Sequence, residues 1–99
     1  MVDKILNEIH LNDGGRIVVL DRLGMGHIYG GMECARNVYR LSKNEDLIWQ
    51  IASDFDSEGS PFTNITLNQD DSLVAYRWDG GAYIIDKECG FATPCFLLK

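Results

Sequence analysis

Two stretches decide the fold class of the chain: residues 37–51, NVYRLSKNEDLIWQI, and residues 66–74, TLNQDDSLV. In each, a short run of apolar, β-branched or aromatic residues leads into a five-residue polar loop, and a second apolar run follows. This succession is typical of two strands joined by a turn. Residues 40–48 also align with residues 66–74, which indicates a weak internal repeat of one hairpin plan.

The same pattern recurs along the whole chain, without the i, i+3, i+4, i+7 recurrence of an amphipathic helix. Glycine-containing turns at residues 12–15 and 79–81 supply positions that tolerate positive φ in tight hairpins. The sequence therefore predicts an all-β fold, an antiparallel meander of about eight short strands forming a curved sheet or a small barrel or sandwich. The expected strands are residues 5–10, 16–21, 36–41, 47–52, 62–67, 73–78, 82–86 and 95–98.

Alternation assigns the side chains of each strand to two faces. Val74, Tyr76 and Trp78 share one face of their strand. Two other strands, at residues 17–20 and 83–85, are apolar on both faces and therefore need cover on both sides. A sheet this small obtains such cover by curling into a barrel or from a second subunit. We expect the chain to associate with itself as a homodimer or larger oligomer.

The composition is that of one globular domain spanning residues 1–99. Hydrophobic residues make up 45% and charged residues 24% of the chain, which are ordinary proportions. The N-terminus lacks the apolar core of a signal peptide, and no apolar run approaches the roughly 20 residues that span a bilayer. Three cysteines, Cys34, Cys89 and Cys95, suit free thiols in a reducing compartment. We expect a cytoplasmic protein.

The net charge of −6 excludes nucleic acid and anionic membranes as expected partners, because both require basic patches. A partner selected by charge would be cationic. The carboxylates gather in three expected loops, around residues 45–46, 54–58 and 70–71. The first and third loops have equivalent places in two hairpins, so we expect them to form one negative rim. The alternative is that the acidity only keeps a small domain soluble.

Residues 37–51 resemble the strand–turn–strand unit of PQQ-like β-propeller repeats, and residues 78–90, with their Asp-x-Glu-x-Gly ending, resemble another. A propeller needs several blades, and the chain has material for two at most. The whole chain is similar to small bacterial orphan β-proteins, such as toxin-immunity-like proteins and integron gene-cassette products. The likeness lies in a Val-Tyr-x-Leu hairpin followed by a Trp-Asp-Gly-x-x-Tyr hairpin. The resemblance implies a binding role and brings no catalytic residues.

Three motifs that could carry chemistry are incomplete. Residues 54–59 mimic the start of an EF-hand calcium loop, but Ile65 stands where the bidentate glutamate belongs. The glycines of residues 23–35, which we expect to form a long loop, precede a strand rather than the helix that a phosphate-binding loop requires. His27 and Cys34 lack the paired ligand spacing of a zinc site, and nothing fixes them as a nucleophile pair. We expect no catalytic residue, metal or cofactor.

The sequence thus predicts a non-enzymatic binding protein, with a cationic protein as the leading partner, as for an immunity protein. The candidate binding residues are acidic loop residues and two aromatic residues: Asp54, Asp56, Glu58, Trp78 and Tyr29. Trp78 is the strongest aromatic candidate, because an indole beside a turn is hard to bury. The alternative function is a small-molecule-binding protein with an aromatic pocket at a subunit interface. The aromatic residues otherwise serve as core and cross-strand packing.

Overall fold

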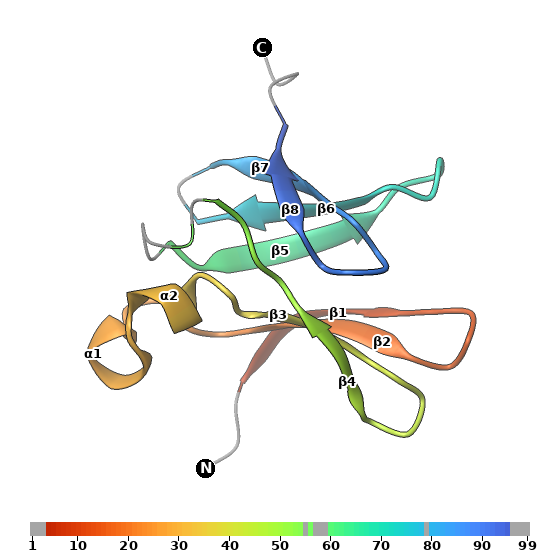
Figure 1. Cartoon of the computed structure of the whole chain (residues 1–99), viewed down its shortest axis with the longest axis horizontal. Coiled ribbons are helices and arrows are strands. Elements are labelled where there is room, and N and C mark those ends of the chain that lie inside the picture. The colour runs from red at the N-terminus through yellow and green to blue at the C-terminus, as the bar shows by residue number, and fades with distance from the viewer. Residues whose placement is uncertain (1–3, 55, 57–59, 79, 96–99) are drawn as a thin grey trace.

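The computed structural model describes residues 4–54, 56, 60–78 and 80–95. The chain folds into two four-stranded antiparallel sheets, each with its strands in chain order (Figure 1). The strands are β1 (Ile5–His10), β2 (Arg16–Leu20), β3 (Val38–Leu41), β4 (Leu47–Gln50), β5 (Phe62–Leu67), β6 (Leu73–Arg77), β7 (Ala82–Ile85) and β8 (Ala92–Pro94). The predicted all-β antiparallel meander is confirmed, as two packed sheets whose described strands do not close into a barrel.

Seven expected strands coincide with β1 to β7, with ends that differ by at most two residues. The last strand of the structure, β8, lies earlier in the chain than the strand expected at residues 95–98, of which residues 96–98 lie outside the described part. The loop after β7 is a short turn. The Gly90 N–H donates to the Asp86 carbonyl over 2.7 Å, and Gly90 adopts a φ of 82°. Pairing therefore resumes at Ala92. Of the expected range, Cys95 is the one described residue, and it lies outside the strand.

The long loop expected at residues 23–35 contains two short helices, α1 (Gly26–Tyr29) and α2 (Gly31–Cys34). Gly30, with a φ of 83°, separates them in a conformation that ends one helix and begins the next. Cys34 and Ala35 are buried and attach the segment to the core. α1 buries none of its residues. The burial of Cys34 and Ala35 therefore fixes the position of this segment. The segment has no apolar face of its own that would have predicted the helices.

The core lies between the inner faces of the two sheets. Its edge-to-face contact between Phe62 and Tyr83, with ring centroids 5.4 Å apart, comes from β5 and β7. The buried cluster consists of Ile17, Val19, Val38, Trp49, Ile51, Phe62, Ile65, Leu73, Ala75, Tyr83, Ile85 and Ala92. Val18 faces the other side of β2, yet only 3% of it is exposed in the single chain. The chain itself therefore covers both faces of β2, whereas Ile84 on β7 is 46% exposed.

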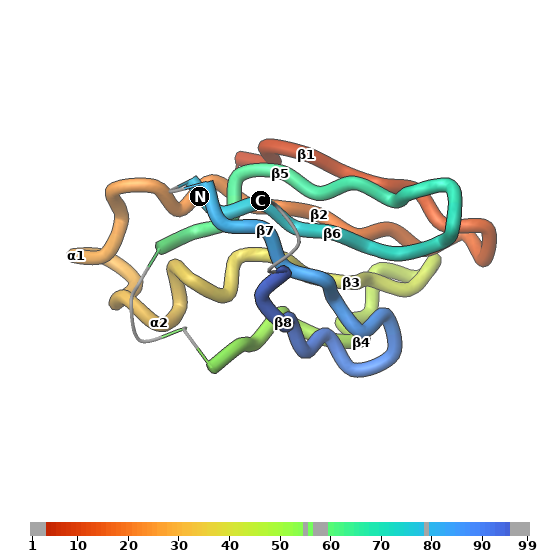
Figure 2. Tube along the Cα trace, turned by 90° about the horizontal axis from the view of Figure 1, so that it is seen from above, coloured from red at the N-terminus to blue at the C-terminus, as the bar shows by residue number. Residues whose placement is uncertain are grey.

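The sheet edges meet each other at two sides of the molecule. Figure 2 shows β1 beside β5 and β4 beside β8. On one side, the Asn7 side-chain amide donates to the Ile65 carbonyl over 3.1 Å. On the other, Ala52 forms a parallel bridge with Phe91, and the Ala92 N–H donates to the Ala52 carbonyl over 2.8 Å. These contacts occupy backbone edges that would otherwise invite pairing with another chain.

The internal repeat has a structural counterpart in its turns. Loops 42–46 and 68–72 close with the same two hydrogen bonds, from the first N–H to the fifth carbonyl and from the fourth N–H to the first carbonyl. Glu45 and Asp71 occupy the fourth position, with φ values of 69° and 71°. Loop 11–15 uses the same turn with a glycine at that position. The repeat is therefore a shared turn plan, because the two hairpins hold different places in their sheets.

All three cysteines are free, as the odd count predicts. Cys34 is buried, and this burial raises the pKa of its thiol. Cys89 is exposed in the loop between β7 and β8. Within the described part of the chain, no helix has the length and apolar character needed to cross a membrane.

Candidate functional site

The acidic loop between β4 and β5 is not the exposed charge cluster that the sequence predicts. Only 2% of Asp56 is exposed. One of its carboxylate oxygens accepts hydrogen bonds from the backbone and the hydroxyl of Ser53, each over 3.0 Å. The other accepts from Arg36 Nε over 2.7 Å. Asp54 is exposed, and Glu58 lies outside the described residues. Asp56 is thus a structural residue, because its carboxylate is already buried and bonded.

The two predicted aromatic residues lie in different elements. Trp78 follows β6 and is 57% exposed, with its backbone N–H donating to the Pro61 carbonyl over 3.1 Å. Its expected exposure beside the turn is confirmed. Tyr29 ends α1 and is half-buried, with the Arg22 guanidinium 4.2 Å from its ring centroid. Tyr29 is therefore packed against a cation of its own chain.

Four hairpin loops, 11–15, 42–46, 68–72 and 86–91, lie together at the end of the molecule opposite the helices (Figure 1). We name this the hairpin end. The expectation that the first and third acidic loops share one end agrees with this arrangement. The loops contain seven carboxylates and two lysines, a balance of −5 against −6 for the whole chain. Their charged residues are Asp13, Lys43, Glu45, Asp46, Asp70, Asp71, Asp86, Lys87 and Glu88.

Ion pairs neutralise part of this charge. Arg16, at the start of β2, pairs with Glu8 and with Glu45. Arg40 lies 3.3 Å from an Asp13 oxygen. The third cation of this group, Lys87, pairs with Asp71 of the neighbouring hairpin loop. The remaining carboxylates of the loops are exposed and have no ion-pair partner among the described residues; they are Asp46, Asp70, Asp86 and Glu88.

Turn hydrogen bonds favour the ionised form of two of these carboxylates. The Ser72 hydroxyl and backbone N–H donate to Asp70 and hold its pKa below the usual range. The backbone N–H groups of Glu88 and Cys89 lower the pKa of Asp86 in the same way. Hydrogen bonds to the charged form of a carboxyl group favour that form. Asp70 and Asp86 therefore stay ionised to a lower pH than an aspartate without such donors.

A cavity of about 450 Å³ opens between these loops. Leu11 forms its apolar wall, in front of the fully buried Ile17, and Asp13, Asp71 and Glu88 place carboxylates at its border. The remaining lining residues are Asn12, Arg40 and Lys87. Cavities of 300–1,000 Å³ with a few polar groups are the usual size of a binding site. The arrangement offers an apolar surface beside a concentrated negative charge.

The border of the cavity is held in place by the loop between β7 and β8. The Lys87 carbonyl accepts from Trp49 Nε1 over 2.7 Å and from Arg40 over 2.6 Å. Gly90 lies so close to the Trp49 ring that a Cβ there would come within 2.7 Å of it. The loop is therefore fastened to the buried core, and it presents Glu88 from a defined position.

Asp71 belongs to the negative rim expected from the sequence, whereas Asp13 and Glu88 lie in two further loops that were not predicted as part of it. The usable signal was the turn order itself, because alternate turns of a meander fall at one end of the molecule. The expectation used this rule only for loops 42–46 and 68–72. Applied to every hairpin, the rule also places loops 11–15 and 86–91 at the same end of the molecule. The contact between Arg40 and Asp13 could not be predicted from the sequence, because the two residues are 27 positions apart and no local pattern links them.

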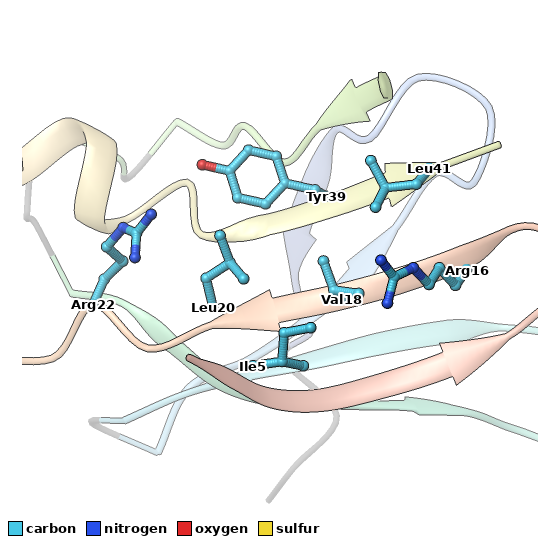
Figure 3. Close-up of a pocket in the computed structure, with 7 residues that line it drawn as sticks. All are labelled: Ile5, Arg16, Val18, Leu20, Arg22, Tyr39 and Leu41. Carbon is cyan, nitrogen blue, oxygen red and sulfur yellow. The ribbon is translucent and has the colours of Figure 1, made fainter. Parts of the chain in front are cut away.

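A second cavity, of about 390 Å³, lies on the outer face of the first sheet (Figure 3). Aliphatic side chains occupy its middle, between the guanidinium groups of Arg16 and Arg22. Tyr39 is its one aromatic lining residue, and the Tyr39 hydroxyl donates to Glu33 over 2.9 Å. The other lining residues are Ile5, Val18, Leu20 and Leu41. The cavity is therefore aliphatic, unlike the aromatic pocket that the sequence suggested.

The family comparison covers nearly the whole chain. The family model described as Domain of unknown function (DUF7957) matches residues 2–94. No curated protein and no solved structure matches the chain. Within the described residues, no group of three or more histidine, cysteine or acidic side chains is placed to hold a metal ion.

Proposed function

The chain belongs to the DUF7957 family, whose function is unknown, and we propose that it is a non-enzymatic protein that binds a cationic protein partner at its hairpin end. The observation that carries this proposal is the cavity between the hairpin loops. It joins an apolar wall to three carboxylates in the part of the molecule with most of the net negative charge. A lysine or arginine side chain has the matching chemistry, because its aliphatic stem prefers apolar contacts and its head prefers carboxylates.

The cations already present do not block such a partner. Lys87 pairs with Asp71, whose side chain is 77% exposed, and Arg40 pairs with Asp13, whose side chain is 58% exposed. Exposed ion pairs contribute only about 0–1 kcal/mol each. A cation from a partner can therefore compete for Asp13 and Asp71, which are the exposed members of these pairs, whereas the Arg40 and Lys87 side chains are 21% and 32% exposed. The unpaired loop carboxylates add long-range attraction, which mainly raises the association rate.

The cellular setting of the proposal is the cytoplasm of a bacterium, as for the immunity-like proteins that the sequence resembles. Free thiols at Cys34, Cys89 and Cys95 support a reducing compartment. In this proposal the protein has no catalytic role, because its candidate site consists of carboxylates on turns beside an apolar wall.

The test measures the affinity of a fluorescein-labelled oligolysine peptide by anisotropy, with an oligoglutamate peptide as the negative probe. The hairpin variant carries Asp13→Asn, Asp71→Asn and Glu88→Gln. Its matched control carries Asp21→Asn, Glu33→Gln and Asp54→Asn, which remove the same charge outside the hairpin loops. Each asparagine or glutamine retains an oxygen that can accept the local hydrogen bonds.

We expect the hairpin variant to bind oligolysine about tenfold more weakly and the control variant to bind within about twofold of the wild type. Binding should weaken as salt rises toward about 0.15 M, where the screening length is about 8 Å. Equal losses in both variants would show that only the net charge matters. No binding by the wild-type protein at low salt would refute a basic partner.

Small-molecule binding is the second candidate function, and the aliphatic cavity of Figure 3 favours it. Its aliphatic lining would suit an apolar molecule. Titration with 1-anilinonaphthalene-8-sulfonate checks this candidate: Leu20→Trp, which narrows the cavity, should abolish the rise in dye fluorescence. A rise that is unchanged in the variant would exclude this cavity as the dye site.

A further inference from the structure

One cation of the hairpin end already lies where the proposed function places a cation of the partner. The Lys87 ammonium donates to the main-chain carbonyl of Asp71 over 2.6 Å and also to a carboxylate oxygen of the same residue. Both residues line the cavity. Leu73 on β6 lies opposite Ile85 on β7, and Asp71 and Lys87 each stand two positions beyond that pair. The cavity border thus contains two oxygens of one residue that bind a primary ammonium group.

We propose that these two oxygens of Asp71 form the ammonium-binding position of the hairpin end, and that Lys87 occupies it until a lysine of the partner takes its place. This inference rests on the proposed function and adds to it the group that is recognised and an internal competitor for that group. Carbonyl and carboxylate oxygens suit an ammonium, because it has three donors and no acceptor. Lys87 then lowers the affinity of the free protein for its partner, because the partner must displace it.

The Lys87 side chain can leave this position while its backbone stays in place. The Lys87 carbonyl accepts from Trp49 and from Arg40, wherever the ammonium lies. Water reaches the pair, because the Lys87 side chain is 32% and the Asp71 side chain 77% exposed. Exposed ion pairs are weak, and a lysine side chain is a flexible four-carbon stem. Rotation of this one side chain is therefore enough to open the position.

Arg40, the other cation that lines the cavity, lacks this freedom. Its guanidinium donates to the Lys87 carbonyl over 2.6 Å, lies 3.3 Å from an Asp13 oxygen and belongs to a side chain that is 21% exposed. Displacing Arg40 would break a contact that fastens the loop between β7 and β8. Displacing the Lys87 ammonium leaves that contact intact. The exchange with a partner therefore concerns Lys87 and not Arg40.

The loops on both sides of the pair close through hydrogen bonds of their own. In the loop between β5 and β6, the Asp71 N–H donates to the Asn68 carbonyl over 2.9 Å. In the loop between β7 and β8, the Gly90 N–H donates to the Asp86 carbonyl over 2.7 Å. Neither bond depends on the ammonium. Lys87→Met keeps an unbranched side chain and removes the ammonium, so it should vacate the position and leave the cavity intact.

Anisotropy titrations with fluorescein-labelled oligolysine at low salt test the exchange. The variant is Lys87→Met, and its matched control is Lys43→Met. Lys43 is exposed in another loop of the hairpin end and has no ion-pair partner within the described ranges of the chain. Both substitutions remove one positive charge from the same end of the molecule. A difference between them therefore reports the ammonium at Asp71, and thermal unfolding establishes that both variants are folded.

We expect Lys87→Met to bind oligolysine about three- to fivefold more tightly than the wild type, which is the range for release of an exposed ion pair. Lys43→Met should bind within about 1.5-fold of the wild type, because distant exposed charges are screened. Equal affinities of the two variants, with binding by the wild type, would overturn the exchange and leave the hairpin end as the binding site. Absence of binding by all three proteins would overturn this inference together with the proposed function.

The Lys87 side chain gives a second readout, which a general charge effect would not move. In ¹³C-labelled protein, the ε-CH₂ signal of Lys87 is identified by its loss in Lys87→Met. It should move toward the position of the Lys43 signal as unlabelled oligolysine is added. A Lys87 signal that keeps its position at saturation would overturn the exchange, because Asp71 would still hold the ammonium.

Discussion

At the scale of single residues, burial decides whether a carboxylate contributes to stability or to the surface charge. Asp56 accepts three hydrogen bonds, including one from Arg36, and is almost fully buried. Asp54, two residues earlier, is exposed. Removing one partner of a buried ion pair leaves an uncompensated charge and costs about 3–5 kcal/mol. The Arg36 side chain is 38% exposed, which reduces this cost because water can solvate it.

We therefore expect Asp56→Ala to lower the free energy of unfolding by about 2–3 kcal/mol. The control Asp54→Ala should stay within about 0.5 kcal/mol of the wild type, as surface substitutions do. Urea denaturation followed by tryptophan fluorescence gives both values. Equal stabilities of the two variants would contradict a structural role for Asp56.

Gly90 offers a second residue-scale prediction. A Cβ at Gly90 would meet the Trp49 ring at 2.7 Å, whereas a Cβ at Gly80 would meet nothing within 4 Å. Both glycines have positive φ, at 82° and 95°. Gly80→Ala should therefore lower the free energy of unfolding by about 1–2 kcal/mol, the cost of a positive φ for a residue with a Cβ. Gly90→Ala should cost about 1–3 kcal/mol more, because the ring must shift. The midpoints of urea denaturation of the two variants measure this difference. Identical midpoints would show that the Trp49 ring moves without a cost in stability and would contradict the prediction.

At the scale of elements, the turns predict how stability depends on pH. Backbone and hydroxyl donors lower the pKa values of Asp13, Asp70 and Asp86 in the folded chain. A folded pKa below the unfolded value of about 3.9 stabilises the fold above that value. This stability is lost as the pH falls through the folded pKa values. The melting temperature should therefore fall steeply below about pH 4.

Asp86→Asn tests whether protonation of the turn carboxylates causes this loss of stability. Asparagine keeps an oxygen that accepts the turn hydrogen bonds, but it does not ionise. Its melting temperature should fall less between about pH 5 and pH 2.5 than that of the wild type. The Asp46→Asn variant serves as the comparison, since Asp46 lies in a loop whose turn donors go to the Ser42 hydroxyl instead. The same acid slope in all three proteins would assign the loss of stability to other carboxylates.

The elements also show which parts of the fold sequence patterns could predict. Apolar runs separated by polar or glycine-containing turns were enough to predict β1 to β7. Both the alternation of side chains and the choice of turn residues depend only on neighbouring sequence. The helices at Gly26–Tyr29 and Gly31–Cys34 have no apolar periodicity, and burial of Ala35 holds them instead. β8 is short and ends in Pro94, while the more apolar residues after it misled the assignment.

Burial of the candidate site residues could be predicted only where it depended on neighbouring sequence. The acidic character of residues 54–58 was local, but the burial of Asp56 depends on Arg36, which is 20 residues away. The exposure of Trp78 followed from the turn beside it and was confirmed. The hairpin end needed the whole topology, because its carboxylates come from four separate loops.

At the scale of the whole molecule, the negative charge is unevenly distributed. The hairpin end carries most of the net negative charge and a cavity with an apolar wall. The outer face of β5 to β8 is uncharged among the described residues and runs along the strands.

The most direct test of the central proposal is a titration of the ¹⁵N-labelled protein with oligolysine, followed by two-dimensional amide NMR at low salt. The proposal predicts that the largest shift changes fall in loops 11–15, 68–72 and 86–91, which border the cavity. They should diminish in the Asp13→Asn, Asp71→Asn, Glu88→Gln variant. Shift changes centred on Asp54 and the helices, or spread evenly over the surface, would contradict the assignment of the hairpin end as the binding site.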